Sequence, residues 1–164
     1  MTLSRTVRLI TMTLFMTLVT VSSYARDENE VVFVKTSDPA INQAIKKARS
    51  TLPSFFSRYK SRYPNVGQYK LKVVFSDSNG SEHFWVQPFR ILSAGQYEGV
   101  LANAPRIVKG LRHGQVVKFT QDMITDWGYK EKGIQYGSFT VCALFKKMPQ
   151  AQANYYRKNH GFRC

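Results

Sequence analysis

One short stretch of the chain, residues 81–89, combines several side chains that could do chemistry. Glu82 and His83 could form a general acid–base pair, and the indole of Trp85 follows two positions later. Such a pair transfers protons in hydrolases, often together with a second carboxylate. In this chain Asp126 could supply that second carboxylate. If the stretch is a strand, however, adjacent side chains point to opposite faces. We therefore expect Glu82 and His83 not to act on one atom, and we assign no catalytic residue.

The histidines do not form a metal-binding pair. His83, His113 and His160 lie too far apart in the sequence for the spacing that zinc-binding pairs use. The chain also lacks the nucleophile elbow, the phosphate-binding loop and the dinucleotide-binding glycine motif. We therefore predict no metal site and no cofactor.

Aromatic and basic side chains point to binding more strongly than to catalysis. In an extended strand Trp85 shares a face with His83 and Gln87, and a neighbouring strand would place Lys72 beside them. Aromatic and cationic side chains are frequent anchors of binding surfaces. Asp126 and Trp127 lie at the edge of a predicted loop and are also candidates for the binding surface. The candidate binding residues are therefore His83, Trp85, Lys72, Gln87, Asp126 and Trp127.

Whether this face can bind a ligand depends on what covers Trp85. One interpretation is structural: a helix covers the indole, and His83 makes a local hydrogen bond. The other is functional: the helices cover only the opposite face, which carries Phe75 and Phe84, and the indole is open to a ligand. The sequence supports both interpretations.

The Asn79-Gly80 dipeptide predicts a tight hairpin between strands 69–76 and 82–91, because both residues tolerate positive φ. The register follows from this turn, and the period of two along each strand sorts the side chains into an apolar and a mixed face. The paired positions would be Phe75 with Phe84 and Val73 with Val86.

The other segments predict an α+β chain. Asp38 and Pro39 have the residue types of a helix N-cap and first turn, and helical spacing of apolar residues follows, although Pro53 predicts a kink or a break. A final helix begins near Pro149 and ends at Gly161. We predict a mostly antiparallel β-meander of about five strands with an N-terminal helix and a C-terminal helix packed on it. The further predicted segments are strands 31–34, 96–102, 115–120 and 136–145, and a turn or short helix at 121–127.

Residues 1–25 have the features of a secretory signal peptide. Two arginines precede a short apolar run, and the small residues Ser23 and Ala25 mark a cleavage site. The apolar run is too short to span a bilayer. We expect cleavage after Ala25, export to the periplasm, no transmembrane segment in the mature chain, and a single domain over residues 26–164.

The predicted mature chain is strongly basic. Loss of residues 1–25 removes two of the 24 Lys and Arg side chains and none of the 10 Asp and Glu side chains, which leaves 22 cationic and 10 acidic groups and a formal net charge of +12. A basic protein is attracted to polyanions. Because export separates the protein from nucleic acid, we expect an anionic envelope component or a protein as its partner.

Cys142 and Cys164 are the only cysteines of the chain. In an exported protein such a pair predicts one disulfide, which here ties a predicted strand to the C-terminal segment and stabilises the fold by roughly 3 kcal/mol. Two separate thiols are the alternative. No Cys-x-x-Cys motif supports a redox function.

Short motifs along nearly the whole predicted mature chain resemble a known family. They include Asp38-Pro39-Ala40-Ile41, Glu82-His83-Phe84-Trp85, Asp126-Trp127 and Lys147-Met148-Pro149. In order and spacing the set resembles the bacterial family of domain of unknown function 2314, which includes small exported YegJ-like proteins. The resemblance implies an α+β fold and an envelope location. It implies no catalytic residue, because the family has no established activity, and Cys164 is not part of its pattern.

Three functions are compatible with these observations. The first is a non-catalytic binding module, expected as a monomer, for an anionic envelope component or a protein partner. The second is an immunity or inhibitor protein against an exported toxin, an analogy based on small size and high charge. The third is an envelope hydrolase that uses Glu82, His83 or Asp126.

Overall fold

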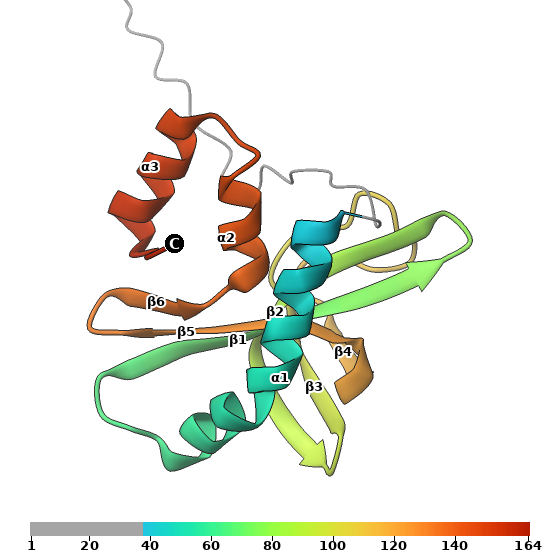
Figure 1. The fold of residues 1–164 in the computed structure, drawn as a ribbon. Coiled ribbons are helices and arrows are strands. Elements are labelled where there is room, and N and C mark those ends of the chain that lie inside the picture. The colour runs from blue at the N-terminus through green and yellow to red at the C-terminus, as the bar shows by residue number, and fades with distance from the viewer. Residues whose placement is uncertain (1–37) are drawn as a thin grey trace, which may run out of the picture.

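A computed structural model describes residues 38–164, which form a single antiparallel sheet of six strands with helices before and after it (Figure 1). The strand order is β4-β3-β2-β1-β5-β6. The predicted signal peptide and the predicted strand 31–34 lie outside the described residues. The elements are α1 (Pro39–Ser61), β1 (Val66–Asp77), β2 (Gly80–Ser93), β3 (Gln96–Leu101), β4 (Val116–Thr120), η1 (Gln121–Met123), β5 (Ile124–Glu131), β6 (Ile134–Gly137), α2 (Phe139–Phe145) and α3 (Gln150–His160).

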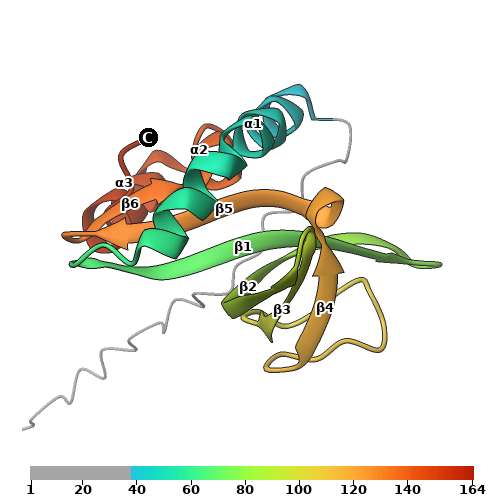
Figure 2. The same cartoon turned by 90° about the horizontal axis from the view of Figure 1, so that it is seen from below.

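The predicted α+β class is confirmed, with one strand and one helix more than expected. Figure 2 shows α1 and α2 on one side of the sheet, and α1 crosses β1 and β5 there. Side chains of α1 and of the strands below it form the core. Its fully buried large members include Phe55 from α1, Leu71 and Val73 from β1, Phe84 and Val86 from β2, and Ile124 from β5.

Helix α1 begins where the sequence predicts. The carboxylate of Asp38 accepts hydrogen bonds from the backbone amides of Ala40 and Ile41 at 2.9 and 3.3 Å, which satisfies two amides that have no partner within the helix. The predicted break at Pro53 is wrong, because the helix continues through this residue to Ser61. Burial of Leu52 and Phe55 on either side of Pro53 holds both halves against the sheet.

The β1–β2 hairpin has the predicted faces but a different register. Val73 pairs with Phe84, whereas Phe75 pairs with Glu82, so the predicted pairs are wrong by two residues. The turn lies one residue earlier than predicted because the side chain of Asp77 accepts a hydrogen bond from the amide of Asn79 at 2.7 Å. A shift of two residues leaves every side chain on its predicted face, since side chains alternate with a period of two.

The predicted turn or short helix at 121–127 is only partly correct. Its first three residues form the short helix η1, and the chain then continues as β5. Asp126 and Trp127 therefore lie within a strand next to β1 rather than at the edge of a loop. The reason is long-range: β5 is held by its pairing with β1, which is distant in the sequence.

The predicted strand 136–145 is wrong beyond its first residues. Strand β6 ends at Gly137, and α2 follows. Gly137 and Ser138 have φ of 70° and 54°, a left-handed conformation that ends the extended chain. A side chain at Gly137 would lie 2.3 Å from the carbonyl oxygen of Trp127, so the position also has no room for a β-carbon. Cys142 consequently lies in a helix.

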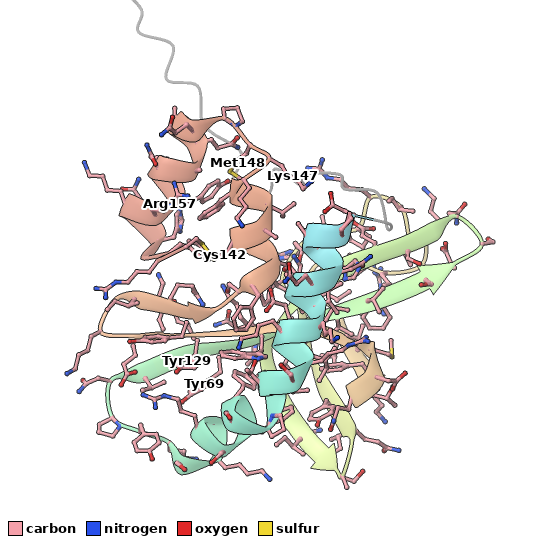
Figure 3. The ribbon with its side chains drawn as sticks, in the orientation of Figure 1. Tyr69, Tyr129, Cys142, Lys147, Met148 and Arg157 are labelled. Atoms are coloured by element: carbon pink, nitrogen blue, oxygen red, sulfur yellow. A yellow bond between two sulfur atoms is a disulfide. The ribbon has the colours of Figure 1, made fainter. Side chains whose placement is uncertain are left out.

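The predicted disulfide between Cys142 and Cys164 is present and joins α2 to the C-terminal segment, with 5.3 Å between the Cα atoms. Figure 3 shows Cys142 on α2 beside this segment. Helix α3 ends at Gly161 in the left-handed conformation, as predicted. The carbonyl of Gly161 accepts a hydrogen bond from the amide of Gln135 at 3.0 Å, which fastens the tail to β6.

Candidate functional site

The ammonium groups of two lysines lie over the indole ring of Trp85. The Nζ atoms of Lys70 and Lys72 lie 4.7 and 5.3 Å from the ring centroid, within the range of a cation–π interaction. Both lysines project from β1 away from the core, because Leu71 between them is fully buried on the other face. We call Lys70, Lys72, His83 and Trp85 the cation–aromatic face. Trp85 is half-buried there, so part of the indole reaches solvent.

The backbone around the cation–aromatic face fixes the indole. The amide of Trp85 donates a hydrogen bond to the side chain of Asn103 at 2.9 Å, and its carbonyl accepts one from the amide of Ala102 at 2.8 Å. Gly128 lies opposite Lys70 on β5. A β-carbon at Gly128 would lie 2.7 Å from the side chain of Gln135 and 3.0 Å from Cε of Lys70, so only a glycine leaves room for these side chains.

A hydroxyl group connects Lys72 to the carboxylate of Asp126. The ammonium of Lys72 donates to Oγ1 of Thr140 at 3.1 Å, and this hydroxyl donates to Oδ2 of Asp126 at 2.7 Å. Asp126 is fully buried and also accepts hydrogen bonds from the amides of Trp127, Phe139 and Thr140 at 2.8, 3.2 and 2.8 Å. The carboxylate therefore holds the start of α2 against β5. A buried carboxylate with four donors is a structural group rather than a catalytic one.

Charge on the cation–aromatic face is only partly neutralised. Burial and the neighbouring charges of Lys130 and Lys72 lower the pKa of Lys70 to about 8, against the opposing effect of Asp126. Burial also lowers the pKa of Lys72, although Asp126 favours its charged form. Burial raises the pKa of Asp126 in spite of Lys72 and the hydrogen bonds from Thr140. An added anion near the two lysines would stabilise their charged forms.

His83 makes the local hydrogen bond that the structural interpretation expects. Its Nδ1 lies 2.9 Å from the hydroxyl of Thr125, and that hydroxyl donates to the carbonyl of Lys72 at 3.2 Å. The hydroxyl must then accept from Nδ1–H, which leaves Nε2 as the acceptor atom of the ring. Burial, with the nearby charges of Lys72 and Arg49, lowers the pKa of His83 to about 4. The ring is neutral at pH 7.

Glu82 lies on the core face and holds a loop rather than a reacting group. Its carboxylate accepts hydrogen bonds from the amides of Arg106, Ile107 and Val108 at 3.0, 2.9 and 3.3 Å. These amides belong to the long connection between β3 and β4. Glu82 and His83 therefore point to opposite sides of β2, as the alternation of a strand predicts.

The structure separates Trp127 from the cation–aromatic face, whereas Gln87 stays on it. Trp127 is buried on the opposite side of the sheet, where its Nε1 donates to the carbonyl of Ala48 at 3.0 Å and its ring stacks on Phe55 at 5.1 Å. Gln87 follows Trp85 by two residues on β2 and therefore shares its face of the strand, next to the register shift in the pairing with β3.

The candidate binding residues chosen from the sequence did not include three residues that form the cation–aromatic face or its hydrogen bonds: Lys70, Thr125 and Thr140. Lys70 could have been found, because it precedes Lys72 by two residues and therefore shares its face of β1. Thr140 had no such indication, since the segment around it was predicted as a strand. Thr125 meets His83 only because the pairing of β1 with β5 shifts register next to Lys72.

Two features of membrane and metal proteins are absent from the part of the chain that the structure describes. No helix among residues 38–164 is long and apolar enough to cross a membrane. Within the same residues no group of three metal-ligating side chains comes together.

Fold and site together define a small basic α+β protein with a tryptophan covered by two lysines. The chain belongs to the family described as "Uncharacterized protein conserved in bacteria (DUF2314)", whose family model matches residues 38–164. The resemblance inferred from the motifs is thus confirmed. Over 115 residues the chain is 30% identical to a protein of Escherichia coli K12 named "Uncharacterized protein YegJ", and the match covers 70% of this chain and 73% of that protein.

A second relative is longer than this chain. It is the "Putative ankyrin repeat protein" of Neisseria meningitidis serogroup B, 28% identical over 134 residues, and the match covers 76% of this chain and 52% of that protein. The chain therefore spans about half the length of this relative. No solved structure matches the chain.

Proposed function

We propose that the protein is a non-catalytic binding module that holds an anionic group of an envelope component on the cation–aromatic face. One observation carries the proposal: Lys70 and Lys72 both lie over the ring of Trp85, and the nearby carboxylate of Asp126 already has four hydrogen-bond donors. An anion placed beside the lysines would pair with two partly buried cations, and the indole holds these cations in place.

The charge distribution of the chain supports an anionic partner. From Lys132 to Cys164 the sequence contains six Lys and Arg residues and no Asp or Glu. Lys and Arg outnumber Asp and Glu by 24 to 10 in the whole chain, and this excess gives a positive field, although some charges pair within the fold. These internal pairs are Asp38 with Lys147, Glu98 with Arg90, and Glu131 with Arg58.

We place the protein in the periplasm because residues 1–25 have the composition of a signal peptide. The hydrolase alternative has less support, since Glu82 and Asp126 are occupied by backbone amides in separate parts of the fold. The immunity alternative stays a prediction, and its test is protection of cells against a toxin encoded by a neighbouring gene.

The test is a binding measurement with defined anionic surfaces. The protein, purified in the form that the cell produces, is titrated with vesicles of phosphatidylglycerol, with lipopolysaccharide, and with vesicles of phosphatidylcholine as the neutral control. We expect binding to at least one anionic surface, and Trp85→Ala and Lys70→Ala should each weaken it about tenfold, which corresponds to about 1.4 kcal/mol.

Lys118→Ala is the matched control, because it removes an exposed lysine on β4 away from the cation–aromatic face. Equal binding by the wild type, Trp85→Ala and Lys70→Ala would contradict the proposal. So would the absence of binding to both anionic surfaces. A crosslinking pull-down from the periplasm tests for a protein partner. Capture of one protein by the wild type but not by Trp85→Ala would show that the partner is a protein rather than an anionic envelope component.

A further inference from the structure

A cleft of about 410 Å³ lies between the C-terminal end of α1 and the start of β1, away from the cation–aromatic face. Its size is within the range of small-molecule sites. Figure 3 shows Tyr69 beside Tyr129 near the C-terminal turns of α1, and their ring centroids are 5.5 Å apart. The lining consists of Tyr59, Lys60, Arg62, Tyr63, Val66 and Tyr69.

Tyrosine rings, rather than tyrosine hydroxyls, form the walls of this cleft. The hydroxyl of Tyr59 donates to the carbonyl of Phe89 at 2.9 Å, and the hydroxyl of Tyr69 donates to the carbonyl of Arg58 at 3.3 Å. Their rings meet at 81° with centroids 5.2 Å apart, so the two walls are nearly perpendicular. Tyr63 is 50% exposed and adds a third ring at the rim. A ligand with a flat, weakly polar face fits such a lining.

The cleft is also basic. Lys60 and Arg62 are exposed side chains of the lining, and the lining contains no acidic residue. The nearby carboxylate of Glu131 is engaged elsewhere, because it pairs with Arg58 at 2.6 Å. Arg58 in turn lies between two rings, 5.0 Å from the centroid of Tyr63 and 5.2 Å from that of Tyr129. Lys60 and Arg62 thus remain available to an anionic group of a ligand.

We propose that this cleft binds an acidic sugar, a pyranose ring that carries a carboxylate. The C–H faces of the pyranose would pack on the tyrosine rings, and the carboxylate would pair with Lys60 and Arg62. A phosphate ion or a lipid headgroup without a ring would use the cations alone and would make no contact with the exposed ring of Tyr63. The inference does not depend on the cation–aromatic face, because the two surfaces share no residue.

The test is a titration of the ¹⁵N-labelled protein, followed by NMR, with D-glucuronic acid and N-acetylmuramic acid. D-glucose and inorganic phosphate are the neutral-ring and ringless controls. We expect chemical-shift changes at the amides of Tyr63 and Val66 that saturate with an acidic sugar, and an affinity at least fivefold weaker for glucose and for phosphate. An equal affinity for phosphate would overturn the proposal, as would an equal affinity for glucose or no saturable change at these amides.

Two variants test the residues without a large change of fold. Tyr63→Ala removes an exposed ring, and Arg62→Asn removes a charge at a position with φ of 46°, a conformation that asparagine tolerates. Each should lower the affinity for glucuronic acid at least fivefold. Lys132→Asn is the matched control, because Lys132 has φ of 49° and is exposed outside the lining. Unchanged affinity in both test variants would contradict the site, and Trp85→Ala should leave sugar binding unchanged.

Discussion

Lys72 and Asp126 are paired across β1 and β5, and the hydroxyl of Thr140 bridges their charged groups. The bridge joins three elements: the central strand, its neighbour and the first turn of α2. It lets a buried carboxylate hold the start of a helix while a lysine beside it keeps its ammonium over Trp85. The cation–aromatic face therefore depends on a hydrogen bond that Lys72 donates to a side chain of α2.

Replacement of Thr140 tests this bridge. Thr140→Val keeps the shape of the side chain but leaves the ammonium of Lys72 and one bond of Asp126 without the hydroxyl, and we expect the free energy of unfolding to fall by about 2 kcal/mol. Thr140→Ser restores the hydroxyl and should cost less than about 1 kcal/mol. Chemical denaturation measures both values. Equal stability of the Val variant and the wild type would contradict a bridging function.

His83 should titrate far below the ordinary value for histidine. We expect the NMR resonances of its ring to change with a midpoint near pH 4 rather than 6.5. Because the folded pKa is depressed, the unfolded chain takes up a proton first, so the free energy of unfolding falls as the pH decreases from 6.5 toward 4. His83→Asn retains a donor for Thr125 but cannot titrate, and its stability should change less over this window. A midpoint near 6.5 would contradict the buried environment.

Glu82 should stabilise the connection between β3 and β4. Glu82→Ala leaves the amides of Ile107 and Val108 without their acceptor, and we expect a loss of about 2–3 kcal/mol. Hydrogen exchange at these two amides should become faster. Glu82→Gln keeps one acceptor oxygen and should retain part of the protection. Exchange rates that stay the same in the alanine variant would show that the loop is held by other contacts.

The disulfide should hold the C-terminal segment against β6. Replacement of Cys142 and Cys164 by serine opens a bridge between residues 22 positions apart, which the chain-entropy estimate values at about 3 kcal/mol. We expect the midpoint of thermal unfolding to fall by roughly 10 °C and the amide of Gln135 to exchange faster. A reducing agent should have the same effect on the wild type and none on the double variant. An unchanged midpoint would exclude a stabilising function.

Local sequence patterns were sufficient for elements that are defined by their own residues. Asp38 with Pro39 predicted the start of α1, and Gly161 predicted the end of α3, because caps involve neighbours within one turn. The alternation along β1 and β2 predicted which side chains face the core. It did so in spite of the wrong register, since an error of two residues preserves the faces.

Long-range contacts decided what these patterns left open. Asp126 accepts the first amides of α2, and β5 is held beside β1. The segment predicted as a turn or short helix is therefore mostly a strand, and the one predicted as a strand is mostly a helix. Neither contact has a local pattern in the sequence. For the same reason the sequence placed Trp127 in the candidate site, whereas its indole donates to Ala48 of α1 in the core.

By itself the sequence determined the α+β class, the positive charge, the disulfide and the separation of Glu82 from His83. These properties follow from composition and from the alternation of a strand. Only the tertiary structure decided what lies over Trp85. That answer required Lys70, Lys72 and the hydroxyl of Thr140 to meet in space, and the packing of α2 against β5 brings Thr140 to β1.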